Sequence, residues 1–326
     1  MTDLKRRILA RVNRDLAEIE QALKDNLNPY LDLVTQVASH ILFSGGKRLR
    51  PLLMVLSARI CGYSGDYDKP FSTSLEYLHT ATLLHDDLVD GASLRRGRPV
   101  AHSQWDNSIV VLVGDFLLAR ALSISAGTDN VKIIKVLAKL TEDMSQGEVH
   151  QLMRKGDVDL KESEYLEVIT RKTAVLFEAA CRTSAMLAGA PSEKENALAT
   201  YGFNLGIAFQ MADDLFDYIL DTRSLGKEVG ADLREGKLTL PVIYALKQAD
   251  PEDRNQMVAT IRDKDFSVEQ FEALVDLLKK YGGVNYAEQQ AAAYIDKAKS
   301  ALAVFEPSET RDLLLDVADY ALARRV

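Results

Sequence analysis

His85-Asp86-Asp87-Leu88-Val89-Asp90 ends an apolar run that begins at Leu75. The same DDxxD pattern returns as Asp213-Asp214-Leu215-Phe216-Asp217, again behind an apolar run. Residues four apart lie nearly one above the other on a helix, so Asp86 and Asp90 project from one face with Asp87 beside them. Such close carboxylates repel each other unless a cation lies between them, and oxygen ligands of this kind suit Mg²⁺. A solvated acidic helix end is the alternative for one box, but two boxes in apolar surroundings favour metal binding.

Basic residues follow the first acidic box and recur elsewhere in the chain. Lys47 and Arg50 come directly after Gly45-Gly46, near the start of a predicted helix, where backbone N–H groups and the helix dipole also attract anions. An ordinary basic loop is the alternative for this segment taken alone. The whole basic set is too large for one phosphate and large enough for two diphosphates: Lys47, Arg50, Arg95, Arg96, Lys172, Lys227 and Lys237.

His79 precedes Asp86 by almost two helical turns, so the two side chains share one helix face. A lone histidine in an apolar helix is more often a core residue. Its alignment with the acidic box nevertheless predicts that His79 contacts substrate. His85 does not share that face and is expected to be structural.

Helical periodicity runs through almost the whole chain, which predicts an all-α fold. The expected helices cover residues 4–25, 31–42, 52–61, 71–90, 108–127, 131–155, 162–189 and 192–221, with further helices from 241 to the C-terminus. There is no alternating strand pattern of any length, no repeat and no low-complexity tract. The polar segment 222–240 directly follows the second acidic box and is predicted to form a lid.

Composition narrows the class of protein further. The 326 residues carry a net charge of −8, which argues against nucleic acid as a partner, so an anionic substrate must be held by local cations and metal. Cys61 and Cys181 lie in apolar helical contexts, as is typical of a reducing cytosol. The N-terminus has no signal-peptide core, and no apolar run reaches the roughly 18 residues of a membrane span. We therefore expect a cytoplasmic protein without a transmembrane segment.

Acidic boxes, basic groups and apolar helix faces together suit a substrate with a diphosphate head and a hydrocarbon tail. Metal and cations stabilise a departing diphosphate, so the reaction requires no side-chain nucleophile. Apolar walls favour ionisation to a carbocation because they exclude water. Other motifs fail on spacing: an EF-hand would need Glu at Gly97, and a P-loop would need Ser or Thr at Arg48.

These motifs resemble those of the trans-isoprenyl (polyprenyl) diphosphate synthases. The matching segments occur in the family's order, cover residues 45–240 and depart from no catalytic motif. They are Gly45-Gly46-Lys47-Arg48-Leu49-Arg50-Pro51, Leu83 to Asp90 with Arg95-Arg96-Gly97, Gly147-Glu148, Lys172-Thr173, Phe209-Gln210 with Asp213 to Asp217, and Gly226-Lys227 through Gly236-Lys237.

The resemblance implies an isoprenoid synthase fold, a single domain over residues 1–326 in which long helices surround a deep cavity, and a homodimer. It implies Mg²⁺ as cofactor, about three ions per active site, bound by Asp86, Asp90 and Asp213 with support from Asp87, Asp214 and Asp217. Isopentenyl diphosphate would be held by Lys47, Arg50, His79 and Arg96. The allylic diphosphate would be held by Arg95, Lys172, Thr173, Gln210, Lys227 and Lys237. The allylic C–O bond would ionise, the isopentenyl double bond would attack the cation, and a proton would be lost.

Product length depends on the residues that precede the first acidic box. Synthases of this family that make short products commonly carry Phe or Tyr one turn before the box, where this chain has the small residues Ala81 and Thr82. The next turns present Leu78, Tyr77 and Ser74, and Phe116 is expected on a facing wall. We therefore predict a long all-trans product between hexaprenyl and decaprenyl, with octaprenyl the best estimate, used as a quinone side chain. Release of such a product suggests peripheral contact with a membrane.

Three alternatives remain open at this point. A short-chain farnesyl or geranylgeranyl diphosphate synthase would share every motif except the small residues before the box. A class I terpene cyclase typically replaces the second acidic box with a mixed Asn/Ser/Glu motif and does not need the glycine-lysine segment. A non-catalytic synthase subunit should have lost acidic-box residues, and this chain keeps both boxes.

Overall fold

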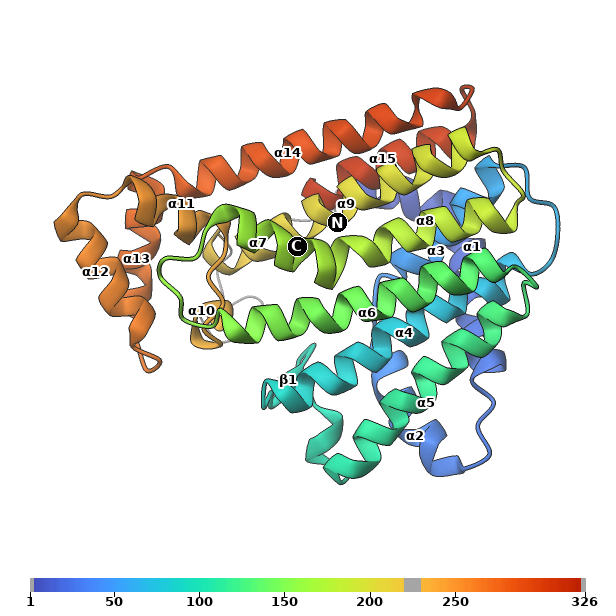
Figure 1. Cartoon of the computed structure of the whole chain (residues 1–326), viewed down its shortest axis with the longest axis horizontal. Helices are drawn as coiled ribbons and strands as arrows, with labels where there is room; N and C mark the ends of the chain where they lie inside the picture. Colours follow the sequence, from blue (N-terminus) through green and yellow to red (C-terminus); the bar gives the residue numbers. More distant parts are fainter. Residues whose placement is uncertain (1–2, 220–229, 324–326) are drawn as a thin grey trace. The chain divides into compact units, whose positions relative to one another are not determined.

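The computed structural model describes residues 3–219 and 230–323, and helices carry nearly all the regular structure in these ranges (Figure 1). This confirms the predicted all-α class. A correction concerns residues 91–107, which are predicted to be a plain connecting loop. They contain the two-residue strands β1 (Leu94–Arg95) and β2 (Arg98–Pro99), paired antiparallel, and the short 3-10 helix η1 (Ala101–Ser103).

The chain divides into two compact units, each with its own part of the predicted site. Unit 1 comprises Met1–Lys139, Ala179–Ala199 and Val304–Leu314; unit 2 comprises Leu140–Glu178, Thr200–Ala303 and Leu315–Val326. Some elements run across this division: α6 (Val131–Met153), α8 (Val175–Leu187), α9 (Ser192–Ile219), η4 (Leu302–Val304) and α15 (Glu309–Ala323). The first acidic box belongs to unit 1 and the second to unit 2.

Unit 1 is organised around the helix that carries the first acidic box. Its other long helices pack against that helix or each other because each has an apolar stripe; in α1 the buried stripe includes Ile8, Val12, Ile19 and Leu23. The helices are α1 (Asp3–Leu27), α2 (Asp32–Leu42), α3 (Leu49–Ile60), α4 (Asp68–Val89) and α5 (Asn107–Ala126). Contacts of α4 with α5, α3 and α1 fix the position of the box within the unit.

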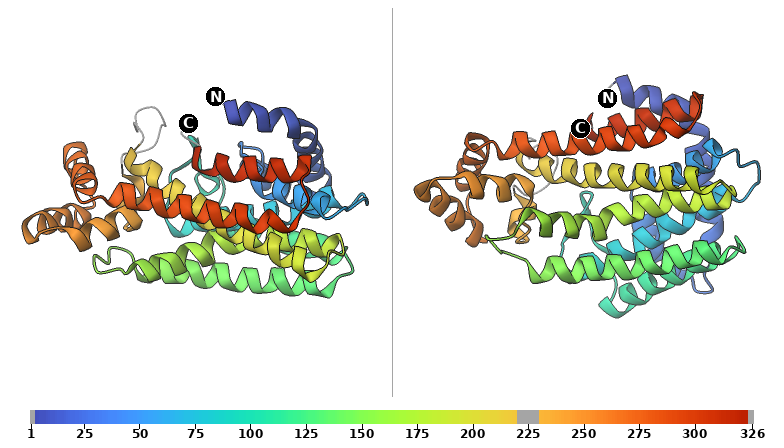
Figure 2. Two further views of the ribbon diagram at one scale, coloured as in Figure 1. Left: turned by 90° about the horizontal axis from the view of Figure 1, so that it is seen from above. Right: turned by 45° about the horizontal axis from the view of Figure 1, so that its top comes forward.

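Unit 2 holds the second box on α9 and a cluster of shorter helices. These are α7 (Glu162–Ile169), the π-helical turn η2 (Thr170–Ala174), α10 (Ala231–Arg234), α11 (Leu240–Gln248), α12 (Pro251–Arg262), α13 (Val268–Lys280) and α14 (Gly283–Ala301). The helices α12 and α13, orange in Figure 2, pack side by side, and α13 also contacts α11 and α14. Local signals set their starts: Asp250 caps α12 ahead of Pro251, and Ser267 with Gln270 forms a capping box on α13.

The helix α5 is long and apolar enough to cross a membrane by length and composition alone. The sequence predicted no apolar run long enough to span a membrane, and α5 corrects that prediction. Asp115 and Arg120 interrupt the apolar surface of α5, and Arg120 donates to the carbonyl oxygen of Asn26 at 2.5 Å. One side of α5 packs against α4 and α2 within unit 1, and length and composition alone are weak evidence for a span.

Candidate functional site

The first acidic box occupies the last turn of α4. The Asp90 N–H donates to the Asp86 carbonyl oxygen at 2.8 Å, so helical geometry continues to the end of the box. Asp86 and Asp90 are half-buried, whereas the side chain of Asp87 is only 2% exposed. The predicted shared face of Asp86 and Asp90 therefore follows from a continuous helix, with Asp87 turned toward the interior of unit 1.

Asp87 is held by an arginine from the hairpin after the box. Arg95 donates to the same oxygen, Oδ1, from Nε at 2.7 Å and from Nη2 at 2.5 Å. The hairpin turns at Arg96 and Gly97, both with positive φ (53° and 71°), which matches the twist of paired strands. The other oxygen of Asp87, Oδ2, is buried and has no hydrogen-bond partner within the described ranges.

The glycine segment lies beside the second arginine of the hairpin. Gly45 and Gly46 have φ of 106° and 155°, values that side-chain-bearing residues rarely adopt. Arg96 donates to the carbonyl oxygen of Gly45 and lies 3.5 Å from the hydroxyl of Ser44. Since α3 begins at Leu49, this arrangement brings Arg96 to the segment that contains Lys47 and precedes Arg50.

His79 lies within a cluster of arginines in unit 1. Burial lowers the pKa of His79 well below its usual value, and the positive charges of Arg50, Arg96 and Arg95 lower it further. His79 is therefore neutral at pH 7 in the ligand-free protein. The structure brings together the residues predicted for isopentenyl diphosphate on this side of the site: His79 on α4, Arg50 on α3 and Arg96 in the hairpin.

The second acidic box is built differently from the first. Asp213 is exposed, while Asp214 is buried and accepts hydrogen bonds from the hydroxyl of Tyr165 at 2.6 Å and from Nε2 of Gln210 at 2.7 Å. Gln210 in turn accepts a hydrogen bond from the hydroxyl of Thr173 at 2.8 Å. Burial raises the pKa of Asp214 to about 6, although the hydrogen bonds from Tyr165 and Gln210 act to lower it. Gln210 and Thr173, both predicted for the allylic diphosphate, thus contact each other.

Two residues near the second box escaped the sequence prediction. The N–H of Asp232 on α10 donates to Asp217 at 3.1 Å, and burial next to Asp214 and Asp217 raises the pKa of Asp232 well above its usual value. Tyr165 on α7 supports Asp214 through its hydroxyl. The only sequence signal for Asp232 is its place between Gly226-Lys227 and Gly236-Lys237. Lys237 pairs with Glu235, and its charge lowers the pKa of Asp214 and Asp232.

Lys172 and Thr173 lie in the π-helical turn η2, which the sequence did not predict. A Cβ on Gly147 of α6 would lie 2.7 Å from Cβ of Arg171, and a Cβ on Gly206 of α9 would lie 2.7 Å from Cα of Ala174. Only glycine allows both helices to approach the turn this closely. The turn directs Lys172 to Glu148, with which it forms an ion pair, and to Oε1 of Gln151 at 2.8 Å. Such one-turn π segments are common at functional sites.

The residues predicted to control product length lie on α4, except Phe116, which is on α5. Ala81, Leu78 and Tyr77 are buried within unit 1, and Thr82 is half-buried with its hydroxyl donating to the carbonyl oxygen of His79 at 2.8 Å. The hydroxyl of Tyr77 donates to the carbonyl oxygen of Leu23 at 2.6 Å, which fixes this ring against α1. The two positions of α4 one turn before the first acidic box, Ala81 and Thr82, thus carry small side chains.

Both boxes supply the oxygen-only donors that Mg²⁺ prefers. In unit 1 the fit rests on Asp87 Oδ2, a buried carboxylate oxygen without a hydrogen bond, one residue from Asp86. The described ranges contain no ready-made group of three His, Cys, Asp or Glu side chains in position to bind a metal. The predicted ligand Lys227 and the first part of the predicted lid, residues 222–229, lie outside the described residues.

Comparisons with known proteins identify the class to which this fold and these motifs belong. A family model described as "Polyprenyl synthetase" matches residues 31–278, so the chain belongs to the polyprenyl synthetase family and is a prenyltransferase. The octaprenyl diphosphate synthase of Escherichia coli is 39% identical over 95% of this chain and 96% of its own length. The all-trans-nonaprenyl-diphosphate synthase (geranyl-diphosphate specific) of Rhodobacter capsulatus is 38% identical over 99% of this chain and 98% of its own.

The solved structures lead to the same fold. A polyprenyl synthase of Caulobacter crescentus, crystallised with calcium and isoprenyl diphosphate, superposes with a TM-score of 0.92 at 40% identity and covers 98% of both chains. This confirms the predicted isoprenoid synthase fold.

Proposed function

We propose that this chain is a long-chain trans-polyprenyl diphosphate synthase whose main product is octaprenyl diphosphate. It adds isopentenyl diphosphate units to an allylic diphosphate by ionisation, condensation and elimination. The observation that carries the product length is the pair of small residues, Ala81 and Thr82, at the level directly before the first acidic box. The octaprenyl and nonaprenyl synthases among the relatives support the same range.

Different groups of side chains bind the two substrates. Lys47, Arg50, His79 and Arg96 bind isopentenyl diphosphate, and a neutral His79 donates one N–H to a phosphate oxygen. Lys172, Thr173, Gln210, Lys227, Lys237 and Arg95 bind the allylic diphosphate. The arginines bind phosphate oxygens in a bidentate manner, and lysine acts as a point charge. This division separates the attacking double bond from the leaving group.

The acidic boxes hold the metal. Asp86, Asp90 and Asp213 bind a cluster of about three Mg²⁺ ions, with Asp87, Asp214 and Asp217 in support. When bound, Mg²⁺ neutralises the allylic diphosphate and stabilises it as a leaving group. The calcium in the Caulobacter crescentus synthase supports a divalent cation at a site of this family. Apolar walls keep water from the carbocation, and the departing diphosphate accepts the proton that is lost.

The two units form one catalytic domain, and the enzyme works as a homodimer in the cytoplasm. Its product is a lipid, so release brings the enzyme into peripheral contact with a membrane, and the product serves as a quinone side chain. The supporting observation for membrane contact is the exposed apolar surface of α5, where Leu112 is 65% exposed.

Product analysis tests the proposed function. The purified protein is incubated with Mg²⁺, radiolabelled isopentenyl diphosphate and either geranyl or farnesyl diphosphate, and products are separated by chain length. We expect label in a long all-trans product, with octaprenyl dominant. A product of fifteen or twenty carbons would identify a short-chain synthase, unlabelled cyclic products a cyclase, and no turnover a non-catalytic subunit.

A further inference from the structure

Arg48 belongs to the glycine-lysine segment but turns away from the substrate side. It precedes α3 with φ 48° and ψ 33°, a left-handed conformation that is uncommon for residues other than glycine. Its side chain is only 5% exposed. Lys47 and Arg50, on either side of it in the sequence, are the residues predicted to bind substrate. Arg48 therefore has a buried guanidinium, whereas its neighbours Lys47 and Arg50 are predicted to bind substrate.

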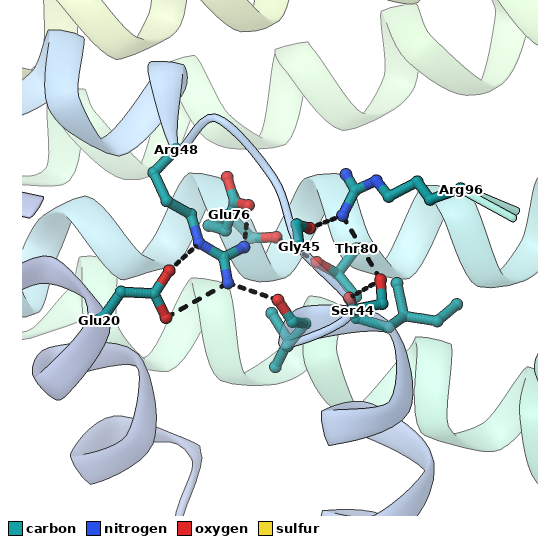
Figure 3. A network of polar contacts seen from close by, with 9 residues as sticks. Glu20, Ser44, Gly45, Arg48, Glu76, Thr80 and Arg96 are labelled. Atoms are coloured by element: carbon teal, nitrogen blue, oxygen red, sulfur yellow. Dashed lines mark hydrogen bonds and ion pairs between the residues drawn. The ribbon is translucent and has the colours of Figure 1, made fainter. Parts of the chain in front are cut away.

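The guanidinium of Arg48 joins three helices of unit 1 (Figure 3). Nε donates to Glu20 of α1 at 2.5 Å, and Nη1 donates to Glu76 of α4 at 2.7 Å. Nη2 donates to the carbonyl oxygen of Leu42 at the end of α2. All three nitrogen atoms are engaged within the protein, so Arg48 is not itself a ligand for diphosphate.

The same guanidinium lies against the glycine segment. A Cβ on Gly46 would lie 3.5 Å from Nη1 of Arg48 and 3.3 Å from Nη1 of Arg96. Arg48 and Arg96 therefore both flank the space beside Gly46, and Arg96 also donates to Gly45 (Figure 3). The hydrogen bond from Arg48 to the carbonyl oxygen of Leu42 spans residues 43–47, so Arg48 holds together the two ends of the segment that contains Lys47.

The charges of this cluster reach the predicted substrate residues. Glu76 is buried, with its side chain 7% exposed, and stands one helical turn from His79. Burial lowers the pKa of Arg96; the charge of Glu76 acts against this shift, and the charge of Arg48 adds to it. Without Arg48, two carboxylates would lie uncompensated beside a site that must attract an anion.

We propose that Arg48 is a positioning residue for the isopentenyl diphosphate site, which it serves by anchoring the glycine segment and neutralising Glu76 and Glu20. This inference rests on the proposed function and deepens it. Arg48 acts through its neighbours, so its loss affects one substrate, and its effect depends on the charge of Glu76.

The test is a double-mutant cycle with KM measured for each substrate. Arg48→Met should raise the KM for isopentenyl diphosphate about ten-fold or more and change the allylic KM by less than about three-fold. Glu76→Gln alone should leave the first KM unchanged or lower it. Glu76→Gln in the Arg48→Met background should lower the KM for isopentenyl diphosphate at least part of the way back to the wild-type value, because the negative charge of Glu76, which repels the diphosphate, is gone. A purely structural role predicts the same rescue in Tm but similar effects of Arg48→Met on both KM values, because a general loosening of unit 1 does not distinguish the substrates.

Arg59→Met is the matched control. Arg59 lies near the C-terminal end of α3, the helix that Arg48 precedes, and pairs with Asp15 of α1, so the variant removes an ion pair between α1 and α3 far from Arg48. It should lower Tm without changing either KM. Arg48→Lys keeps the charge but loses the three-way contact, so its KM for isopentenyl diphosphate should lie between those of wild type and Arg48→Met. If Arg48→Met does not fold, Arg48→Lys takes its place in the cycle.

A binding measurement separates this inference from the proposed function. Calorimetric titration with inorganic diphosphate should show weaker binding to Arg48→Met than to wild type, and partial recovery in the double variant, even if the wild type incorporates no isopentenyl unit. Equal effects of Arg48→Met on both KM values, a double variant worse than Arg48→Met, or unchanged diphosphate binding would each overturn the role of Arg48.

Discussion

Arg95 and Asp87 form a two-donor ion pair in which both nitrogens contact one carboxylate oxygen, Oδ1. The second oxygen, Oδ2, remains buried without a hydrogen bond. A buried carboxylate oxygen without a partner is costly, and a bound cation would offset that cost. The pair therefore links the first acidic box to a hairpin arginine that is predicted to bind the allylic diphosphate.

Loss of a box aspartate should abolish catalysis without unfolding the protein. Asp86→Ala and Asp213→Ala are each expected to lower kcat by about three orders of magnitude or more, because Mg²⁺ loses a protein ligand and no longer stabilises the diphosphate leaving group. Steady-state kinetics at saturating Mg²⁺, with circular dichroism as a folding check, measures this. The control is Asp115→Ala, which removes an exposed carboxylate near His85. Near-normal turnover in either folded box variant would refute the metal assignment.

The two diphosphate sites should respond to different substitutions. Arg50→Ala should raise KM mainly for isopentenyl diphosphate, and Lys172→Ala mainly for the allylic substrate. Each lost charged hydrogen bond is worth about 1.5–3 kcal/mol, so shifts of ten-fold or more are expected. Initial rates with one substrate varied at a time give both constants. Equal shifts for both substrates in both variants would contradict the division.

The π-helical turn should tolerate no side chain at Gly206. Gly206→Ala places a Cβ against Ala174, and we expect the displaced turn to raise the allylic KM about ten-fold through Lys172 and Thr173. Gly283→Ala is the matched control, because its Cβ would collide with the carbonyl oxygen of Pro241 where α14 packs on α11. The control should lower Tm and leave KM unchanged. If both variants alter KM alike, the turn does not position Lys172.

The raised pKa of Asp214 makes metal binding sensitive to pH. Its pKa is about 6 in the ligand-free fold against a usual 3.8, so the folded protein binds this proton more tightly than the unfolded chain. The contribution of Asp214 to stability is therefore greatest below about pH 4 and is lost as pH rises through about 6. Mg²⁺ needs the carboxylate, so its stabilising effect should grow over the same range.

Thermal unfolding at pH 5 and pH 7.5, with and without Mg²⁺, measures both effects. The rise in Tm on adding Mg²⁺ should be larger at pH 7.5. In Asp214→Asn the pH dependence of the apoprotein's Tm should shrink, because the titrating group is gone. An unchanged pH dependence in that variant would show that Asp214 does not titrate in this range.

Bulk at Ala81 should shorten the product. The series Ala81→Val, Ala81→Leu and Ala81→Phe should give progressively shorter chains, ending at about fifteen or twenty carbons, because a tightly packed wall cannot move aside. Chromatography of the products gives the distribution, and the rate of the first condensation should stay within about three-fold of wild type. A wild-type length in all three variants would mean that the tail does not pass Ala81.

Periodicity and motif spacing predicted much of this structure. The helices fall close to their expected bounds, and the first box lies on α4 as the spacing of Asp86 and Asp90 requires. The hairpin was missed because two-residue strands carry no alternating pattern, and Arg96-Gly97 is a weaker turn signal than Asn-Gly. Asp232 was missed because its shifted pKa depends on burial beside Asp214 and Asp217, which no local pattern reveals.

The π-helical turn at Thr170–Ala174 also sets the rotation between the two helices that it joins. A π turn amounts to one residue added to an α-helix, and each residue of an α-helix turns the chain by about 100°. Deleting one residue from the turn would restore a regular helix and rotate α7, with Tyr165, by about that angle relative to α8. The turn therefore sets the direction in which Tyr165 faces, and with it the hydrogen bond from Tyr165 to Asp214 of the second acidic box.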